Sequence, residues 1–255
     1  MAVTVKSVNE LRLMRESCKI AAETLKVVEK NIVEGIAAKE LDKIADAYIR
    51  SKNAVPAFKG YNGYPSTLCV SINEEIVHGI PREDKILKAG DIVSIDVGVY
   101  KNGFYGDTAA TYTVGKVEDA RVLLLIETTR KALYEGLKYM VAGKNVYDIS
   151  FAIQTIAESA GFSVVREYTG HGIGRKLHEE PYVLNYVPDK MLRKNGYILR
   201  KGNVFAIEPM LNMGRYETEV LSDKWTVVTR DRKWSAHFEH TVAVGDKKPE
   251  ILTEV

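Results

Sequence analysis

Hydrophobic residues near the amino terminus recur at alternating steps of three and four, a spacing that predicts an amphipathic helix with one buried face. The apolar positions of this helix are Leu11, Met14, Cys18, Ala21, Leu25, Val28 and Ile32. Ser7 and Glu10 precede most of them with the spacing of a capping box, which places the helix start at Ser7. The same periodicity predicts a second helix over 37–51. Its inward positions are Leu41, Ile44, Ala45 and Tyr48.

Strand-like patterns follow these two helices. Apolar residues predict a strand near 69–72, and the segment 91–114 alternates apolar and polar residues on both sides of Asn102-Gly103. This dipeptide favours a two-residue hairpin turn. The second half repeats the order, with a helix over about 118–140, another that Asn145 caps and Gly161 ends, and then strands.

The two halves also resemble each other residue by residue. The segment 88–96, KAGDIVSID, aligns without gaps on 200–208, RKGNVFAIE, so Asp96 matches Glu208. The aligned glycines are Gly90 with Gly202 and, in the short matches VEG and VAG, Gly35 with Gly143. The alternative is a chance likeness between similar secondary-structure signals.

A duplication predicts one domain over 1–255, built from two α-α-β units of roughly 1–115 and 116–255. A pseudo-twofold axis would relate the two units, and the acids of the two sheet halves would meet near that axis. At 255 residues, the chain is long enough to bury a substantial core in one large domain.

Composition and charge narrow the class of protein. The chain has 45% hydrophobic and 27% charged residues, as in soluble globular proteins, and its 36 basic and 34 acidic residues give a net charge of only +2. We therefore expect neither disorder nor a nucleic-acid partner. The longest apolar run, VLLLI, is too short to span a membrane, and the start lacks a secretion signal. We expect a cytoplasmic monomer with Cys18 and Cys69 as reduced thiols.

The hairpin carries one acid in each arm, Asp96 and Asp107. A two-residue turn would pair Gly98 with Asp107 and Asp96 with Ala109, so the two carboxylates would share one face about 7 to 8 Å apart at the backbone. Two facing carboxylates repel, and one must take a proton unless a cation lies between them. The alternative is that one side chain points to solvent, as most carboxylates do.

Further candidate ligands occur in apolar surroundings. Glu208 and Glu239 lie in predicted strands, and His171 stands between two glycines. Four carboxylates and one imidazole suit two adjacent divalent ions, because bridging carboxylates balance the charge of the ions. Taken singly, each of these residues is more often an exposed or loop residue. The tripeptide HGI at His171 recurs at His78.

These motifs together resemble the methionine aminopeptidases of type I. The resemblance rests on Asp96 and Asp107 at their spacing, on YTGHGIGRKLHEEPYVLNY, on IEPM and on FEHT, in the family's order, and it covers essentially the whole chain. It implies an α+β pita-bread fold in which duplicated α-α-β units, related by a pseudo-twofold axis, form a central curved antiparallel sheet with outer helices.

The resemblance also implies a set of site residues. The metal ligands would be Asp96, Asp107, His171, Glu208 and Glu239, with Asp107 and Glu239 bridging two divalent ions. His78 and His178 would lie beside the substrate. The methionine pocket would consist of Phe58, Tyr61, Tyr64, Cys69, Leu177 and Trp225. Some relatives carry an aromatic residue at the position of Leu177 and a cysteine at that of Phe58, so the pocket's shape here would differ from theirs.

The implied activity is removal of the initiator methionine from nascent polypeptides whose second residue is small. A hydroxide that bridges two ions of cobalt, manganese, iron or zinc would attack the methionyl carbonyl. Glu208 would relay the proton, His178 would bind the carbonyl oxygen, and His78 would contact the leaving nitrogen. The basic segment 187–201 is a candidate contact with the ribosome surface, and a solvated loop is its alternative.

Three other functions compete with this one. Xaa-Pro peptidases and prolidases of the same fold would share all five ligands, but they generally carry a large extra amino-terminal domain. Type II methionine aminopeptidases carry a helical insertion, for which the thirty residues between Glu208 and Phe238 leave no room. A metal-free scaffold that binds protein or RNA would have lost ligands, and its basic footprint is missing here.

Overall fold

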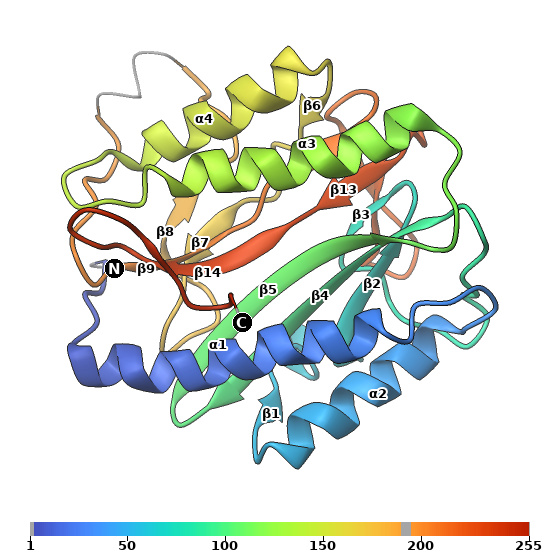
Figure 1. The fold of residues 1–255 in the computed structure, drawn as a ribbon, viewed down its shortest axis with the longest axis horizontal. Helices are drawn as coiled ribbons and strands as arrows, with labels where there is room; N and C mark the ends of the chain where they lie inside the picture. Colours follow the sequence, from blue (N-terminus) through green and yellow to red (C-terminus); the bar gives the residue numbers. More distant parts are fainter. Residues whose placement is uncertain (1–2, 190–194, 255) are drawn as a thin grey trace.

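Two pairs of helices and a central sheet make up most of the computed structural model, which describes residues 3–189 and 195–254 (Figure 1). The helices are α1 (Val8–Glu29), α2 (Ala38–Ser51), the 3-10 turn η1 (Tyr61–Gly63), α3 (Ala120–Leu137) and α4 (Val146–Ser159). The strands are β1 (Val55–Pro56), β2 (Leu68–Ile72), β3 (Glu75–Val77), β4 (Ile92–Lys101), β5 (Phe104–Thr113), β6 (Ser163–Val164), β7 (Gly170–Gly172), β8 (Glu179–Val183), β9 (Val204–Ile207), β10 (Met210–Asn212), β11 (Thr218–Val220), β12 (Val227–Thr229), β13 (Ser235–His237), β14 (Glu239–Ala243) and β15 (Glu250–Ile251).

The central sheet has nine strands, and its main path runs β1-β4-β5-β14-β9-β7-β8. Strand β2 pairs with β4, and β15 pairs with β14. All pairs of this sheet are antiparallel. Two three-stranded sheets, β13-β10-β6 and β11-β12-β3, complete the β structure of the described residues.

The predicted helix starts are confirmed. Ser7 caps α1 and Asn145 caps α4, and each forms a full capping box with the acid three residues later. These caps satisfy backbone N–H groups that otherwise have no partner in the first turn of a helix. Helix α3 is shorter than the expected 118–140: it begins at Ala120, where the Asp119 side chain caps it by accepting a hydrogen bond from the Arg121 N–H, and it ends at Leu137.

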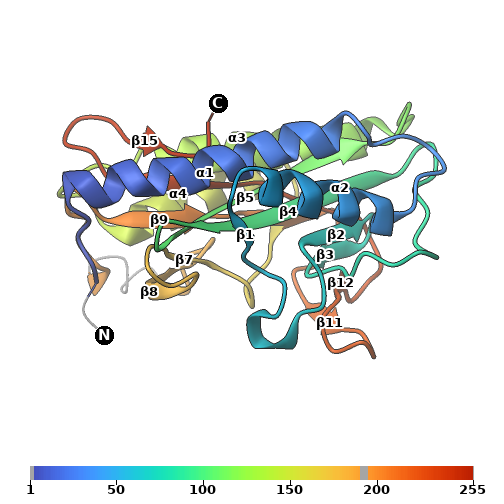
Figure 2. The ribbon, with the colours of Figure 1, turned by 90° about the horizontal axis from the view of Figure 1, so that it is seen from below.

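Helices α1 and α3 run across one face of the central sheet, with α2 beside α1 and α4 beside α3 (Figures 1 and 2). Helix α1 lies very close to β5: a Cβ atom added to Gly106 would stand only 2.7 Å from the Cα of Cys18. Successive residues of a strand face opposite sides of the sheet. Asp107 therefore points away from the helices, to the other face.

This contact gives a prediction for stability. Gly106→Ala would force the backbones of α1 and β5 apart, and we expect the free energy of unfolding to fall by about 1 to 3 kcal/mol, as for other overpacked cores. Urea unfolding followed by circular dichroism measures the change. Thr113→Ala, at an exposed position of the same strand, serves as the control and should stay within about 0.5 kcal/mol of wild type. Equal stability of the two variants would contradict the tight contact.

The β4–β5 hairpin has the predicted register. Lys101 pairs with Phe104, Gly98 with Asp107 and Asp96 with Ala109. Asn102 and Gly103 have φ angles of 52° and 84°, as a turn with two left-handed residues requires. The predicted strand register, which places Asp96 and Asp107 on the same face of the hairpin, is thus confirmed.

The two halves of the chain repeat several backbone details. Gly35 and Gly143 have φ angles of 87° and 86°, and each donates its N–H to a leucine carbonyl, Leu87 or Leu199, at 2.8 and 2.9 Å. Gly90 and Gly202 likewise share φ angles of 92° and 85°, which favour glycine. In the sheet, β5 and β14 are adjacent at the centre, and β4 and β9 flank them. These correspondences support the proposed duplication.

Two separate apolar clusters form the larger part of the core. One packs α1 and α2 against the first half of the sheet, around Leu41 and Ile95, and the other packs α3 and α4 around Leu125 and Ile149. Cys18 and Cys69 are free and buried, and burial raises the pKa of the Cys18 thiol to about 12, so it stays protonated.

No helix among the described residues is long and apolar enough to cross a membrane. The segment 187–201, named above as a candidate ribosome contact, includes 190–194, which lie outside the described residues. That assignment stays a prediction.

Candidate active site

A cavity of about 190 Å³ opens on the sheet face away from α1. Its lining contains every residue that the sequence nominated as metal ligand, substrate contact or pocket wall, together with Asn62. The lining residues are Phe58, Tyr61, Asn62, Tyr64, Cys69, His78, Asp96, Asp107, His171, Leu177, His178, Glu208, Trp225 and Glu239. The structure therefore brings together all thirteen nominated side chains.

Strand pairing explains how the acids converge. Ala109 of β5 pairs with Asp96 of β4 on one side and with Glu239 of β14 on the other. The small alanine leaves the two flanking carboxylates room, and Asp107 stands two residues along the same face. Glu208 directly follows β9, which pairs with β14. The acids thus come from both halves of the chain.

Threonine hydroxyls join the two halves beside the acids. The Thr241 hydroxyl accepts a hydrogen bond from the Asp107 N–H at 3.0 Å and donates one to the Asp107 carbonyl at 2.7 Å. The Thr111 hydroxyl makes the same pair of bonds with the backbone of His237, at 2.9 and 2.8 Å. These hydroxyl groups take the place of backbone hydrogen bonds between the β5 and β14 segments. They therefore hold this seam, the boundary between β5 and β14, together beside the acids.

The side chains of Asp107, His171 and Glu239 each offer one ligand atom, and these atoms lie within 4.8 Å of one another. His171 Nε2 is 3.5 Å from Glu208 Oε1. Glu239 is 2% exposed and Asp107 4% exposed. This is a concentration of negative charge that burial makes unfavourable unless protons or cations neutralise it.

The pKa values of the four carboxyl groups are shifted accordingly. Burial raises the pKa of Asp96 to about 7. Burial, followed by repulsion from the neighbouring carboxylates, raises the pKa values of Asp107, Glu208 and Glu239 well above the ordinary range. Without a bound cation, the cluster therefore holds protons at a pH at which isolated carboxyl groups are ionised.

His171 is arranged as a neutral ligand. Burial lowers its pKa to about 3, and its Nδ1 lies 2.9 Å from the Gly172 carbonyl, to which it donates. The proton on Nδ1 leaves a lone pair on Nε2, the atom that faces Glu208. A backbone carbonyl that fixes the tautomer in this way is typical of histidines that bind metals.

The donor set fits divalent cations. One oxygen each of Asp96, Asp107 and Glu239 is buried without a hydrogen-bond partner among the described residues. Unpartnered buried oxygens are costly, and coordination of a cation would satisfy them and offset the mutual repulsion of the carboxylates. Oxygen donors with one imidazole suit divalent manganese, iron, cobalt or zinc.

Two histidines flank this cluster. The Nδ1 atom of His178 is 2.8 Å from the Tyr61 hydroxyl, and the His178 ring centre is 4.2 Å from that of His171. His78 has a φ angle of 57°, which is unusual for a residue with a Cβ atom, and Tyr168 and Trp225 meet its ring edge to face. Burial lowers the pKa of His78 to about 4, so this ring is neutral at neutral pH.

Aromatic side chains form the apolar end of the cavity. The rings of Tyr64 and Trp225 meet at a centroid distance of 5.1 Å. The Tyr64 hydroxyl donates to backbone carbonyls of Leu68 and Gly79, so its polar atom is satisfied outside the cavity. The Phe58 ring occupies the space over Gly98, where a Cβ atom would come within 2.5 Å of it.

The sequence did not nominate three residues at this site. Asn62 lines the cavity beside Tyr61. Tyr168 contacts His78, and His237 is 2% exposed with its Nε2 atom 3.9 Å from Glu208 Oε2. His237 stands two residues before Glu239, and alternate residues of a strand face the same side of the sheet, so this spacing could have indicated His237 as a site residue. Asn62 lies in the short 3-10 turn η1 and Tyr168 in an irregular segment, and neither segment has this alternation.

The fold and this cluster define a metal-dependent peptidase. The chain belongs to metallopeptidase family M24, whose family model matches residues 12–246. The chain is 48% identical over 253 residues to methionine aminopeptidase 1 of Bacillus subtilis, and the alignment covers 99% of this chain and 100% of the relative. The crystal structure of a methionine aminopeptidase from Thermotoga maritima has a TM-score of 0.96, 42% identity and full coverage of both chains. Within family M24, the chain is thus a member of the methionine aminopeptidase group.

A prolidase from Pyrococcus furiosus shares the fold alone. It has 18% identity and a TM-score of 0.77, and the match covers 98% of this chain but 65% of the prolidase chain. The rest of the prolidase chain lies outside the match. The predicted family and the predicted α+β pita-bread fold are both confirmed.

Proposed function

We propose that this protein removes the amino-terminal methionine from nascent polypeptides whose second residue is small, by metal-dependent hydrolysis in the cytoplasm. The observation that supports this function best is that a buried carboxylate–histidine cluster and an aromatic pocket line one cavity. Relatives of full-length similarity that are named methionine aminopeptidases support the choice of substrate.

Five residues would hold two divalent ions, with Asp107 and Glu239 shared between them. The other ligands are Asp96, His171 and Glu208. When bound, such ions activate a water molecule as nucleophile and polarise a carbonyl group. The ions would be manganese, iron, cobalt or zinc, all of which accept oxygen donors with one imidazole.

Glu208 is the group that we assign to proton transfer. It directly follows β9 at the cavity wall, and its Oε1 atom lies 3.5 Å from His171 Nε2. A carboxylate in this position can take a proton from the attacking water and pass it to the leaving amine.

The two flanking histidines would contact the scissile bond. With the Tyr61 hydroxyl donating to Nδ1, the neutral His178 ring carries its proton on Nε2 and can donate to the carbonyl oxygen as negative charge develops there. Burial keeps this ring neutral by lowering its pKa. His78, fixed by Tyr168 and Trp225, would contact the leaving nitrogen.

The position of the α-amine would limit the cut to the first peptide bond. A methionine side chain would enter the apolar end, between Tyr64, Trp225 and Leu177. The free α-amine would then face the metal ligands, where a bound divalent ion would accept it as a neutral amine. A residue before the methionine would turn this amine into an amide and remove that contact.

A peptide assay tests the proposal. The metal-supplemented protein should cleave Met-Ala-Ser at least about 100-fold faster, as kcat/KM, than Met-Leu-Ser or Ala-Pro-Ser, since the wrong fit removes transition-state contacts worth a few kcal/mol. Liquid chromatography of the released amino acid measures the rates. Preference for Ala-Pro-Ser would favour a prolidase-like activity, and cleavage of none of the three would favour a scaffold.

A further inference from the structure

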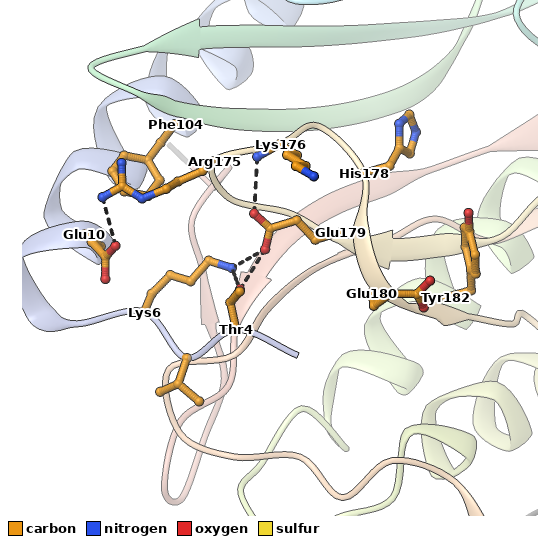
Figure 3. A pocket seen from close by; sticks show the side chains of 11 residues that line it. Thr4, Lys6, Glu10, Phe104, Arg175, Lys176, His178, Glu179, Glu180 and Tyr182 are labelled. Atoms are coloured by element: carbon orange, nitrogen blue, oxygen red, sulfur yellow. Dashed lines mark hydrogen bonds and ion pairs between the residues drawn. The ribbon is translucent and has the colours of Figure 1, made fainter. Parts of the chain in front are cut away.

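The loop 174–179 carries two side chains of the proposed site, Leu177 and His178, and its far side faces the amino-terminal arm of the chain. Leu177 and His178 line the site cavity. The next residue, Glu179, begins β8 and turns to the opposite side. Figure 3 shows Glu179 directed toward Lys6 and Thr4, while His178 points away from them.

The Glu179 carboxylate joins the arm to the loop. Its Oε2 atom accepts hydrogen bonds from Lys6 Nζ at 2.7 Å and from the Thr4 hydroxyl at 2.7 Å. Its Oε1 atom accepts one from the Lys176 backbone N–H at 3.2 Å. The side chains of Lys6 and Glu179 are only 5% and 12% exposed, so water screens this ion pair weakly. Burial raises the pKa of Glu179, but the hydrogen bonds from Lys6 and Thr4 lower it by more. The net pKa lies below the ordinary value, so the carboxyl group stays ionised.

The arm itself is fixed to the sheet. The Lys6 N–H donates to the Gly202 carbonyl at 2.7 Å, and the Asn203 side chain donates to the Thr4 carbonyl at 2.8 Å. These contacts lie just before β9, the strand that Glu208 directly follows. The Lys6 stem also packs on Gly174, where a Cβ atom would come within 2.4 Å of Lys6 Cε. The ion pair therefore links the loop to a rigid part of the fold.

A cavity of about 480 Å³ lies between the arm and the loop, and Lys6, Glu179 and His178 are among its lining residues (Figure 3). On the other side of the loop, the Tyr105 N–H donates to the Gly174 carbonyl at 2.9 Å. Arg175 also joins the loop to α1 through its pair with Glu10 at 3.1 Å, but the Arg175 side chain is 66% exposed, so water screens this pair. The Lys6–Glu179 pair is therefore the buried ion pair that resists movement of the loop into the cavity.

We infer that Lys6 and Glu179 are positioning residues, which hold Leu177 and His178 in the site through a buried ion pair between the amino-terminal arm and the loop. The inference rests on the proposed function for the consequence to catalysis. The brace itself is a property of the fold and can be measured without substrate.

The test compares Lys6→Met, which keeps the apolar stem, with Lys201→Met, which removes an exposed lysine paired with Asp246. Hydrogen–deuterium exchange should show uptake in the peptide 174–180 at least about tenfold faster in Lys6→Met, because local opening exposes its amides. The Lys201→Met control should exchange like wild type. Equal exchange in the two variants overturns the inference, whatever the protein's activity.

Kinetics on Met-Ala-Ser separate positioning from mere loss of folded protein. We expect kcat/KM of Lys6→Met to fall about 100-fold, because small misplacements of contact groups are costly, with a lower kcat and a higher KM. A smaller folded fraction would lower kcat and leave KM unchanged, and that result also overturns the inference. Lys6→Arg should restore most of the activity. Bound metal should equal that of wild type.

Glu179→Gln provides a second variant in case Lys6→Met does not fold. The amide keeps the size of the side chain and removes its charge, so exchange and KM should change in the same direction as in Lys6→Met. Failure of wild type to cleave Met-Ala-Ser would contradict the proposed function, and the exchange comparison would still decide on the brace.

Discussion

Glu208→Gln is expected to lower kcat for Met-Ala-Ser by about 10² to 10⁴-fold, the usual contribution of a positioned acid–base group. The amide has nearly the same shape as the carboxylate, but it cannot accept and return a proton. Steady-state kinetics at saturating divalent metal measures the loss, and metal analysis of the same sample shows whether ions are still bound. KM should change much less than kcat, since the aromatic pocket is untouched.

The matched control is Glu40→Gln, in which the same substitution is made at an exposed carboxylate of α2. This variant should match wild type in kcat and KM. If Glu208→Gln retained activity within about threefold of wild type with its metal in place, another group would have to carry the proton, and the role assigned to Glu208 would be wrong.

Removal of divalent metal by a chelator is expected to abolish peptide cleavage and to make stability depend strongly on pH. Folding raises the pKa values of Asp96, Asp107, Glu208 and Glu239 in the metal-free protein. Such groups contribute stability below their unfolded pKa values near 4, and the contribution is lost as pH rises through the folded values, about 7 for Asp96. The buried histidines, whose pKa values are lowered, oppose this trend below their ordinary pKa near 6.5, so the comparison belongs above that pH. The melting temperature of the metal-free protein should therefore fall between pH 7 and pH 8.

Scanning calorimetry at the two pH values, with and without manganese, measures this effect. A loss of about 2 kcal/mol corresponds to a fall of roughly 5 °C in a protein of this size, and saturating metal should restore the melting temperature at pH 8. Asp46 and Asp84, whose pKa values are lowered, change stability in the opposite direction and only at acid pH. A metal-free protein that is more stable at pH 8 than at pH 7 would contradict the buried carboxylate cluster.

Much of the fold could be predicted because the signals are local. The capping boxes at Ser7 and Asn145 and the two-residue turn at Asn102-Gly103 each depend on residues within four positions of one another. The hairpin register then fixes the face of Asp96 and Asp107 without reference to the rest of the chain. Glu208 could be predicted as a site residue because the repeat aligns it with Asp96. Glu239 could be predicted because it lies in apolar surroundings in the sequence.

Other features depend on contacts between distant segments and leave no local pattern. The closeness of Gly106 to Cys18 comes from helix α1 lying on β5. The left-handed backbone of His78 occurs directly after β3, where its ring meets that of the distant Tyr168. The pairing of Lys6 with Glu179 joins residues 173 positions apart. No periodicity indicates such a pair, since both residues are ordinary surface types in sequence.

The seam between β5 and β14 bears on the order in which the molecule assembles. Its bonds, such as those between Asp107 and Thr241, join residues 134 positions apart, and contacts of such separation form late because a long loop must close first. On a ribosome, the amino-terminal helices and the β4–β5 hairpin can form while synthesis continues. Glu239, a proposed ligand, belongs to β14, so the proposed chemistry must wait until this strand has emerged.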